Sequence, residues 1–233
     1  MEKPVLWYIA DPMCSWCWGF APVIAQIKEE YATAFTLKLM PGGLRPTAAP
    51  LLPEKRAQIL QHWHTVHATT GQPFTFEHAL PETFIYDTEP ACRGVVSASF
   101  IDPEKTFPFF AATQHAFYVD QKDVTQLATL AELAVHLAIP ESQFVSAFQS
   151  DNAKQHTLEG FQRAAQWGIS GFPTLVIESA AQRYLLTTGY RPFETLRQLL
   201  DSWLQLGIAA SYPGTGAVFR RGGSLWSVNK AGS

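Results

Sequence analysis

Two cysteines separated by two residues, Cys14 and Cys17, are the residues of this 233-residue chain whose types and spacing most clearly suggest chemistry. They follow an apolar run, residues 5–9, whose β-branched and aromatic composition predicts a strand. An Asp-Pro pair ends that run, and a helix is predicted from Ser15 onward. Cys14 is therefore expected at a helix N-terminus, where free N–H groups can lower a thiol pKa from about 8.5 to roughly 3.5–7.5. With Cys17 one turn later, the pair is suited to thiol–disulfide exchange.

The segments on both sides of a long middle region predict the elements that would position this pair. The sequence order is strand, helix, strand, then a helical block, then helix, strand, strand and helix, which predicts an α/β fold. A mixed sheet of four or five strands with helices on both faces would bury these segments together. The predicted elements are a helix over residues 18–31 kinked at Pro22, strands over 35–40, 174–177 and 184–188, the last two forming a β-hairpin, and a helix over 193–206.

The middle of the chain predicts an all-helical insertion. Residues 41–53 are rich in proline and include the pair Gly42-Gly43, which marks a boundary. The predicted domains are residues 1–45 with 153–210, a helical insertion over 46–152, and a tail over 211–233 that forms a hairpin or is disordered. Helices are expected over residues 56–69, 92–100, 109–119, 124–137, 141–148 and 153–167.

The composition narrows the possible functions. A net charge of −3 and the lack of a basic patch argue against nucleic-acid binding. No apolar stretch reaches the length of a membrane span, so no membrane partner is expected. Three cysteines are too few for a disulfide framework. No signal-peptide pattern is visible, and we expect a cytoplasmic protein, where a CxxC pair is more often catalytic or metal-binding than structural.

Several motifs together resemble the thioredoxin fold and, within it, the DsbA-like family with its inserted helical domain. The CxxC lies at the first strand–helix junction, and Pro22 follows where this fold kinks its active-site helix. Residues 167–174 (WGISGFPT) look like the family's cis-proline segment. Residues 11–20 (DPMCSWCWGF) and 88–93 (TEPACR) resemble the FrnE-like cytosolic branch, which is related to 2-hydroxychromene-2-carboxylate isomerases and kappa-class glutathione transferases. The resemblance covers about residues 4 to 206.

The resemblance agrees with the chemistry of the two thiols. Cys14, nearer the helix start and expected to be the more exposed, would be the attacking thiolate, and Cys17 would resolve the mixed disulfide. Ser15 and Trp16 lie between the sulfurs and would tune the stability of the Cys14 thiolate. Trp16 is also expected to face the substrate, whereas Trp18 is expected in the core.

The same resemblance implies a binding loop and a class of substrates. Pro173 is expected in cis, with its loop packed against the disulfide, and Phe172 would offer backbone groups to an extended peptide. Substrates would be protein or small-molecule thiols and disulfides. No cofactor or metal is expected, although glutathione is a candidate co-substrate.

Other chemically capable residues allow two interpretations each. The CxxC could be half a zinc site, but no second pair of ligands follows. Cys92 could be a third redox thiol or, as we favour, a small buried residue. Asp11 could accept a proton from Cys17 or simply form a turn. We expect the cluster of His62, His64 and His67 to be solvated or packed rather than metal-binding; His64 and His67 share a helix face.

Three functions are compatible with these features. The first is a DsbA-like thiol–disulfide oxidoreductase that acts through Cys14 and Cys17. The second is a glutathione-dependent isomerase or transferase, although those relatives usually carry serine in place of Cys14 and need no second cysteine. The third is a non-enzymatic adaptor that uses the thioredoxin fold to bind a partner.

Overall fold

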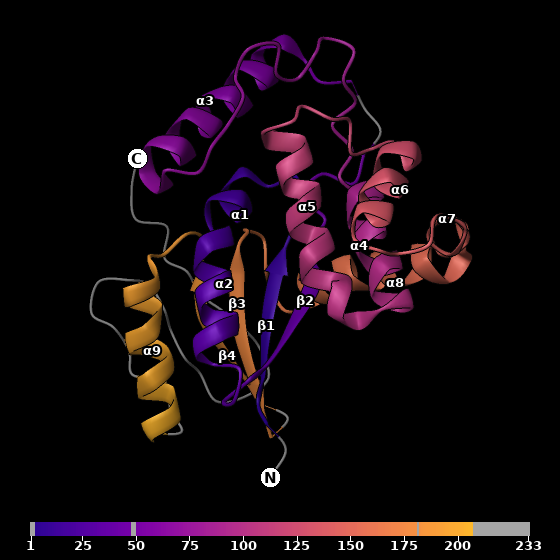
Figure 1. Ribbon diagram of the computed structural model, residues 1–233. Helices are drawn as coiled ribbons and strands as arrows, with labels where there is room; N and C mark the ends of the chain where they lie inside the picture. The colour runs from indigo at the N-terminus through magenta and orange to yellow at the C-terminus, as the bar shows by residue number, and fades with distance from the viewer. Residues whose placement is uncertain (1–2, 48–49, 181, 207–233) are drawn as a thin grey trace.

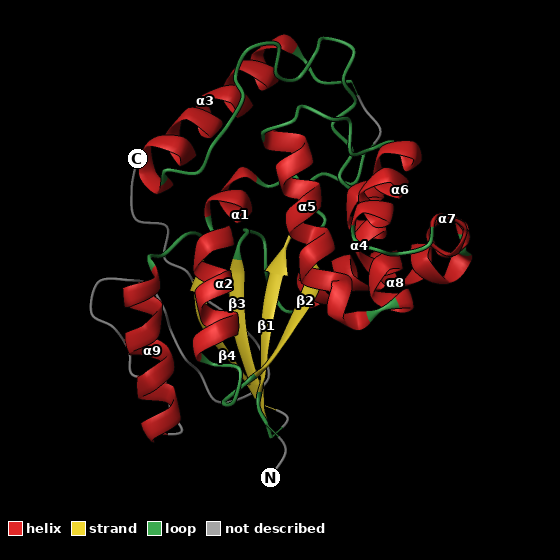
Figure 2. Ribbon diagram, in the orientation of Figure 1, coloured by secondary structure: helices red, strands yellow, loops and turns green. Residues whose placement is uncertain are grey.

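The computed structural model describes residues 3–47, 50–180 and 182–206 (Figure 1). The predicted tail, residues 211–233, and the last residues of the predicted segment 153–210 lie outside the described residues. Figure 2 shows a central sheet with helices around it and a helical block beside it. No described helix combines the length and the apolar character needed to cross a lipid bilayer.

The sheet described has four strands in the order β2-β1-β3-β4. Strand β1 (Val5–Ala10) is parallel to β2 (Thr36–Pro41) and antiparallel to β3 (Thr174–Ser179), which pairs with β4 (Gln182–Thr188) as the predicted hairpin. These four strands and their flanking helices confirm the thioredoxin-like α/β fold with a helical insertion.

Alternating side chains of β1 give the sheet two buried faces. Leu6 and Tyr8 join the main core, which includes side chains of α2 (Ala21–Glu30) and α9 (Phe193–Leu206). Ile9 points to the other face, where a smaller core forms around Trp167 at the end of α8 (Asp151–Gln166). Figure 1 shows α2 in front of the sheet and most of the insertion on the β2 side.

The predicted kinked helix after Cys17 is instead two helices. Helix α1 (Ser15–Gly19) is followed by the capping residue Phe20, and α2 begins at Ala21. Pro22 therefore lies in the first turn of α2, where the missing N–H costs no helical hydrogen bond, rather than in a helix interior. The break leaves the CxxC on a short helix of its own.

The inserted helices begin earlier than expected where proline opens them. Helices α3 and α4 each have proline at the first or second position, a place that proline favours. Apart from one isolated β-bridge between Pro50 and Ile85, the described part of the insertion contains no strand. Its elements are α3 (Pro53–Thr70), α4 (Glu89–Ile101), the short 3₁₀ helix η1 (Pro103–Lys105), α5 (Thr106–Tyr118), α6 (Leu127–His136) and α7 (Glu141–Gln149).

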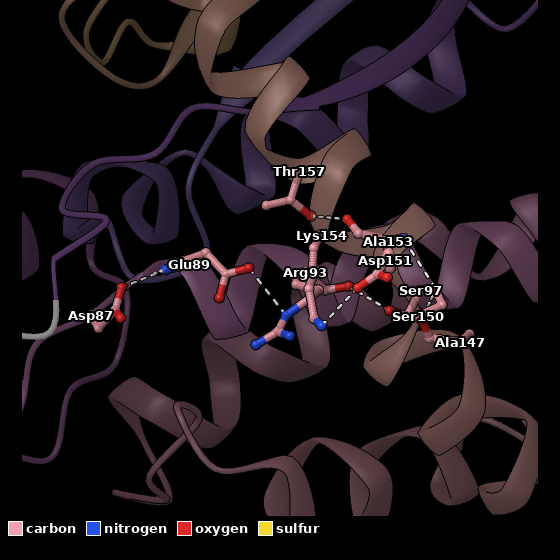
Figure 3. Close-up of polar contacts among 10 residues, drawn as sticks. All are labelled: Asp87, Glu89, Arg93, Ser97, Ala147, Ser150, Asp151, Ala153, Lys154 and Thr157. Atoms are coloured by element: carbon pink, nitrogen blue, oxygen red, sulfur yellow. Dashed lines mark hydrogen bonds and ion pairs between the residues drawn. The ribbon is translucent and has the colours of Figure 1, made fainter.

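Polar contacts lie within α4 and at the junction of α7 and α8, as Figure 3 shows. Arg93 of α4 pairs with Glu89 at 3.1 Å, and its guanidinium lies 4.1 Å from the ring centroid of Phe148 on α7. Ser150 caps α8 by accepting the N–H of Ala153 at 3.1 Å. Helix α8 packs on both α4 and β2 and so links the insertion to the sheet.

A layer of aromatic rings joins the insertion to the CxxC helix. Trp18 stacks on Tyr118 of α5 with an interplanar angle of 10°, and Trp63 of α3 meets Tyr118 edge-on at 4.9 Å between centroids. Helices α1 and α3 can approach each other closely because Gly19 of α1 has no side chain. A Cβ atom there would lie only 2.7 Å from Cγ1 of Val66 on α3.

We therefore predict that Gly19→Val destabilises the protein. The added side chain would force α1 away from α3, and overpacking of this kind costs about 1–3 kcal/mol. Chemical denaturation of both proteins measures the difference in the free energy of unfolding. Ala25→Val, which adds a similar volume at an exposed site on α2, is the matched control. Equal stability of the two variants would contradict the close approach of α1 and α3.

Candidate active site

Cys14 is the N-cap residue of α1, with extended backbone angles of φ −88° and ψ 116°. Its carbonyl accepts the N–H groups of Cys17 and Trp18, at 2.9 and 3.1 Å, which begins the helix directly after the strand β1. No side chain makes a capping hydrogen bond at this helix start, and Cys14 is the residue at the N-cap position. The Cys14 residue is 6% exposed and Cys17 is 0% exposed, the order that the sequence predicted.

The loop before β3 faces the Cys14 thiol. The Phe172–Pro173 peptide bond is cis, and the Cys14 thiol donates to the Phe172 carbonyl oxygen at 3.7 Å. The Phe172 ring lies directly against the backbone of Gly42, where an added Cβ would approach the ring to 2.3 Å. The N–H of Gly42 donates to the Ala10 carbonyl at 2.8 Å, which holds the end of β2 beside the end of β1.

The two thiols of the CxxC have different surroundings. Both are free in this structure. Complete burial raises the pKa of the Cys17 thiol well above its usual value, and its hydrogen bond with Cys14 and the charge of that thiolate raise it further. Cys17 is consequently a protonated thiol at neutral pH and must lose its proton during any reaction in which it attacks a disulfide.

Asp11 is more than the turn residue that its place before proline suggests. It is fully buried, and its carboxylate accepts the backbone N–H groups of Met13 and Leu44, both at 2.8 Å. The Cys92 thiol donates to the same carboxylate at 3.5 Å. Asp11 thus ties the segment before Cys14 to the loop after β2 and to α4. Burial raises the pKa of Asp11, and these hydrogen bonds oppose the shift in part.

Cys92 is buried, as favoured from the sequence, but its surroundings are polar on one side. It is 0% exposed and lies on the first turns of α4, with Asp11 as its hydrogen-bond partner. Burial, followed by the charge of Asp11, raises the pKa of the Cys92 thiol well above its usual value. A protonated, buried thiol is a poor nucleophile, so this environment suits a structural donor better than a third redox thiol.

Two members of the histidine cluster, His64 and His67, pack against aromatic rings. His64 stacks on Phe76 with centroids 4.0 Å apart, and His67 meets Phe74 and Phe76 edge-on. His67 also contacts the Gln72 carbonyl. Among the residues that the structure describes, no three His, Cys, Asp or Glu side chains are grouped so that they could hold a metal ion.

Half-buried side chains surround the Cys14 thiol at the surface. Ser15 and Trp16 are partly exposed, and the Trp16 ring lies 6.0 Å from that of Tyr190, between centroids. Trp18 is buried, as predicted, and its indole N–H donates to the Pro73 carbonyl. The sequence did not indicate Tyr190 as a site residue, because it lies 173 positions after Cys17 and no recognisable motif surrounds it.

Three buried tyrosines beneath the CxxC were also not identified from the sequence. Tyr8, Tyr86 and Tyr118 are each at most 3% exposed. The Tyr86 hydroxyl donates a hydrogen bond to the carbonyl of Met13, the residue before Cys14. Burial is the main cause of a raised pKa at all three hydroxyls, and the charge of Cys14 is a smaller contribution at each. Aromatic residues in strands and helices usually indicate core packing, so no sequence signal separated these from the other rings.

A CxxC at a helix start, faced by a cis-proline loop on a thioredoxin-like sheet that carries a helical insertion, is typical of DsbA-like thioredoxin-fold proteins. Residues 6–201 match the DSBA-like thioredoxin domain, and the chain belongs to this family.

Solved structures of two bacterial proteins show the same fold. A candidate protein disulfide isomerase from Nitrosomonas europaea is 75% identical, with a TM-score of 0.85, covering 88% of this chain and 98% of its own. The cytosolic disulfide reductase DsbM from Pseudomonas aeruginosa is 26% identical, with a TM-score of 0.74 and coverage of 87% and 99%; DsbM has also been solved with GSH.

A curated relative has a different description. The ClpXP adapter protein SpxH from Bacillus licheniformis is 21% identical over 210 residues, which cover 87% of this chain and 68% of SpxH.

The environment of Asp11 predicts a pH-dependent contribution to stability. Because its pKa is raised in the folded protein, ionisation of Asp11 opposes folding above the native pKa, and this penalty vanishes below the unfolded value of about 3.9. Lowering the pH through that interval should stabilise the wild type relative to Asp11→Asn, which does not titrate. Denaturation of both proteins across this range measures the difference. A difference that stays constant, or that shifts against the wild type, would contradict the assignment.

Proposed function

We propose that this protein is a thiol–disulfide oxidoreductase that acts through Cys14 and Cys17. The proposal rests on the position of the Cys14 thiol. It lies at a helix start, 3.7 Å from the Phe172 carbonyl oxygen of the cis-proline loop. A sulfur at a free helix start is placed to react as a thiolate. The family membership and the disulfide reductase DsbM among the similar structures support the same activity.

In the proposed reaction, the Cys14 thiolate attacks a substrate disulfide. One substrate sulfur joins Cys14 in a mixed disulfide, and the other leaves as a thiolate that takes up a proton. Cys17 then loses its proton and attacks the Cys14 sulfur. This step forms the Cys14–Cys17 disulfide and releases the second substrate sulfur, which becomes a thiol. The substrate is reduced by two electrons and the CxxC is oxidised.

The surface around Cys14 suggests how substrates bind. Ser15 and Trp16 follow Cys14 in the chain and are partly exposed, and the Phe172 carbonyl, just before Pro173, accepts the Cys14 thiol. We propose that these four residues contact an extended stretch of a protein substrate or a small thiol. Glutathione is the proposed co-substrate that re-reduces the CxxC, in keeping with the structure of DsbM with GSH. The cytosolic description of DsbM supports a cytoplasmic location.

Replacing each cysteine separately should give two different results. Cys14→Ser should abolish reduction of a disulfide substrate, because the other two cysteines, Cys17 and Cys92, are both 0% exposed. Cys17→Ser should instead accumulate a mixed disulfide on Cys14, visible as a mass increase that a reductant removes. Cys92→Ser is the control and should retain turnover. Full activity of Cys14→Ser would overturn the proposal.

The reduction potential of the CxxC should indicate the direction of electron flow. We expect a value near that of thioredoxin, about −270 mV, as suits a disulfide reductase. Equilibration in glutathione buffers, with the oxidised fraction measured by thiol alkylation, provides the value. A potential between about −120 and −200 mV would indicate an oxidant or isomerase instead. Absence of any Cys14–Cys17 disulfide would remove the redox function altogether.

An adaptor function is the second candidate, and the SpxH relatives favour it. Such a protein would bind a partner through its surface and would not need the chemistry of the two thiols. The double variant Cys14→Ser/Cys17→Ser separates the two functions. Loss of substrate reduction together with retained binding of a specific partner would support the adaptor, and loss of both would support the oxidoreductase.

A further inference from the structure

A cavity of about 320 Å³ lies within the helical insertion. Its lining comes from α3, from α5, from the segment after α3 (residues 78–85) and from the segment between α5 and α6 (residues 121–126). None of the lining residues belongs to the CxxC or to the cis-proline loop, so the cavity is separate from the candidate active site. Its volume lies within the range of about 300–1,000 Å³ that is usual for small-molecule sites.

Aromatic and aliphatic side chains form much of the cavity wall. Trp63 of α3 and Phe117 of α5 both line it, and their rings meet edge-on with centroids 5.6 Å apart. Phe84 also lines it and stacks beside Phe117 at 5.9 Å between centroids. Leu80 and Ile85 add aliphatic surface. A flat apolar ring placed against these side chains would bury a large area and make favourable ring contacts.

Hydrogen bonds fix the two loop segments to each other. The Thr75 N–H donates to the Tyr118 carbonyl at 2.9 Å, and the Thr75 hydroxyl donates to the Val119 carbonyl at 2.6 Å. The side-chain amide of Gln121 donates to the carbonyls of Thr75 and Glu77. The cavity between these segments is therefore preformed, and a ligand would not have to order the loops when it binds.

Three residues of the cavity wall have a left-handed backbone conformation. The φ angles are 57° at His78, 52° at Leu80 and 55° at Gln121. They are three of the five non-glycine residues with positive φ among those that the structure describes. Side chains disfavour this conformation, and where it persists it concentrates at ligand-binding and switch regions. The backbone thus marks the same place as the cavity does.

The charged side chains of the lining are already engaged or lie in solvent. Lys122 donates to a carboxylate oxygen of Glu132 at 2.8 Å. Asp123 accepts the backbone N–H and the hydroxyl of Thr125 at 3.0 and 2.6 Å. The side chain of His78 is 87% exposed. The lining therefore offers no buried, unpaired charge, and this disfavours an ionic ligand, whose own charge would lose its hydration without compensation.

We propose that this cavity is a binding site for a small, uncharged aromatic molecule, held against the rings of Trp63, Phe84 and Phe117. The volume sets the size of the ligand, the aromatic wall favours a flat ring, and the engaged charges favour a neutral one. The inference is independent of the redox chemistry of Cys14 and Cys17, because the cavity shares no residue with that site.

The test titrates the full-length protein with N-phenyl-1-naphthylamine, an uncharged aromatic probe whose fluorescence rises in apolar surroundings. We expect saturable binding at a single site per chain. The dye 8-anilino-1-naphthalenesulfonate has the same ring skeleton with a negative charge added, and it should bind at least about tenfold more weakly. Equal or tighter binding of the sulfonate would contradict the preference for an uncharged ligand.

Substitutions in the lining should block the probe. Thr83 lines the cavity and is exposed, so Thr83→Trp should fold and should weaken binding at least about tenfold by filling the space. Glu82→Trp adds the same ring at the neighbouring exposed position, which is not part of the lining, and should leave binding unchanged. Gln126→Trp fills the cavity from the other loop segment, and it decides the question if thermal unfolding shows that Thr83→Trp is not folded.

A further variant separates this cavity from the CxxC. Cys14→Ser/Cys17→Ser should bind the probe as the wild type does. Loss of binding in this double variant, or displacement of the probe by glutathione, would place the probe at the CxxC and overturn the inference without affecting the proposed redox function. Absence of saturable binding, or equal weakening in Thr83→Trp and Glu82→Trp, would overturn it as well.

Discussion

The central position of β1 is the constraint on which the active site depends. Strand β1 is parallel to β2 and antiparallel to β3. The C-terminal ends of β1 and β2 and the N-terminal end of β3 therefore lie at the same end of the sheet. Cys14 follows β1, Gly42 follows β2 and Pro173 precedes β3, so strand pairing alone brings three segments together that are far apart in sequence. Hydrogen bonds from Gly42 to Ala10 and from Cys14 to Phe172 then complete the arrangement.

The inserted helices also contact the helix that carries the CxxC. Trp18, Tyr118 and Trp63 form a continuous aromatic contact from the CxxC helix through α5 to α3. Gly19 permits the close packing of α1 on α3 that this contact requires. The insertion therefore packs against the helix that carries Cys17. Burial is the main reason that the pKa of the Cys17 thiol is raised.

Local patterns in the sequence predicted the parts of the molecule that local physics determines. The strand–CxxC–helix junction, the β-hairpin of β3 and β4, and the order of the helices follow from periodicity and from Gly and Pro punctuation. The break at Phe20 was missed because a proline in a helical pattern can mark either a kink or a new start. The hydrogen bond between Cys92 and Asp11 could not be predicted, since the two residues lie 81 positions apart. By itself, Asp11 before a proline indicates a turn, and a lone Cys92 indicates core packing.

The buried Tyr8 shows a further limit of what the sequence predicts. An aromatic residue in an apolar strand predicts a core position, and Tyr8 occupies one. Whether its hydroxyl meets water, a carbonyl or a thiol depends on how α1 turns back over β1, and only the folded chain determines that. The CxxC motif identified the reacting atoms, whereas the groups that adjust their reactivity come from tertiary packing.

The shallow exposure of Cys14 has a consequence for the choice of reaction partners. With only 6% of the residue accessible, Cys14 offers little of its surface to a reacting disulfide. Under the proposed function, a disulfide in a small molecule or a flexible segment would reach this sulfur more easily than one recessed in a rigid folded surface. The shallow exposure of the nucleophile would then select partners by their flexibility, before any difference in redox potential applies.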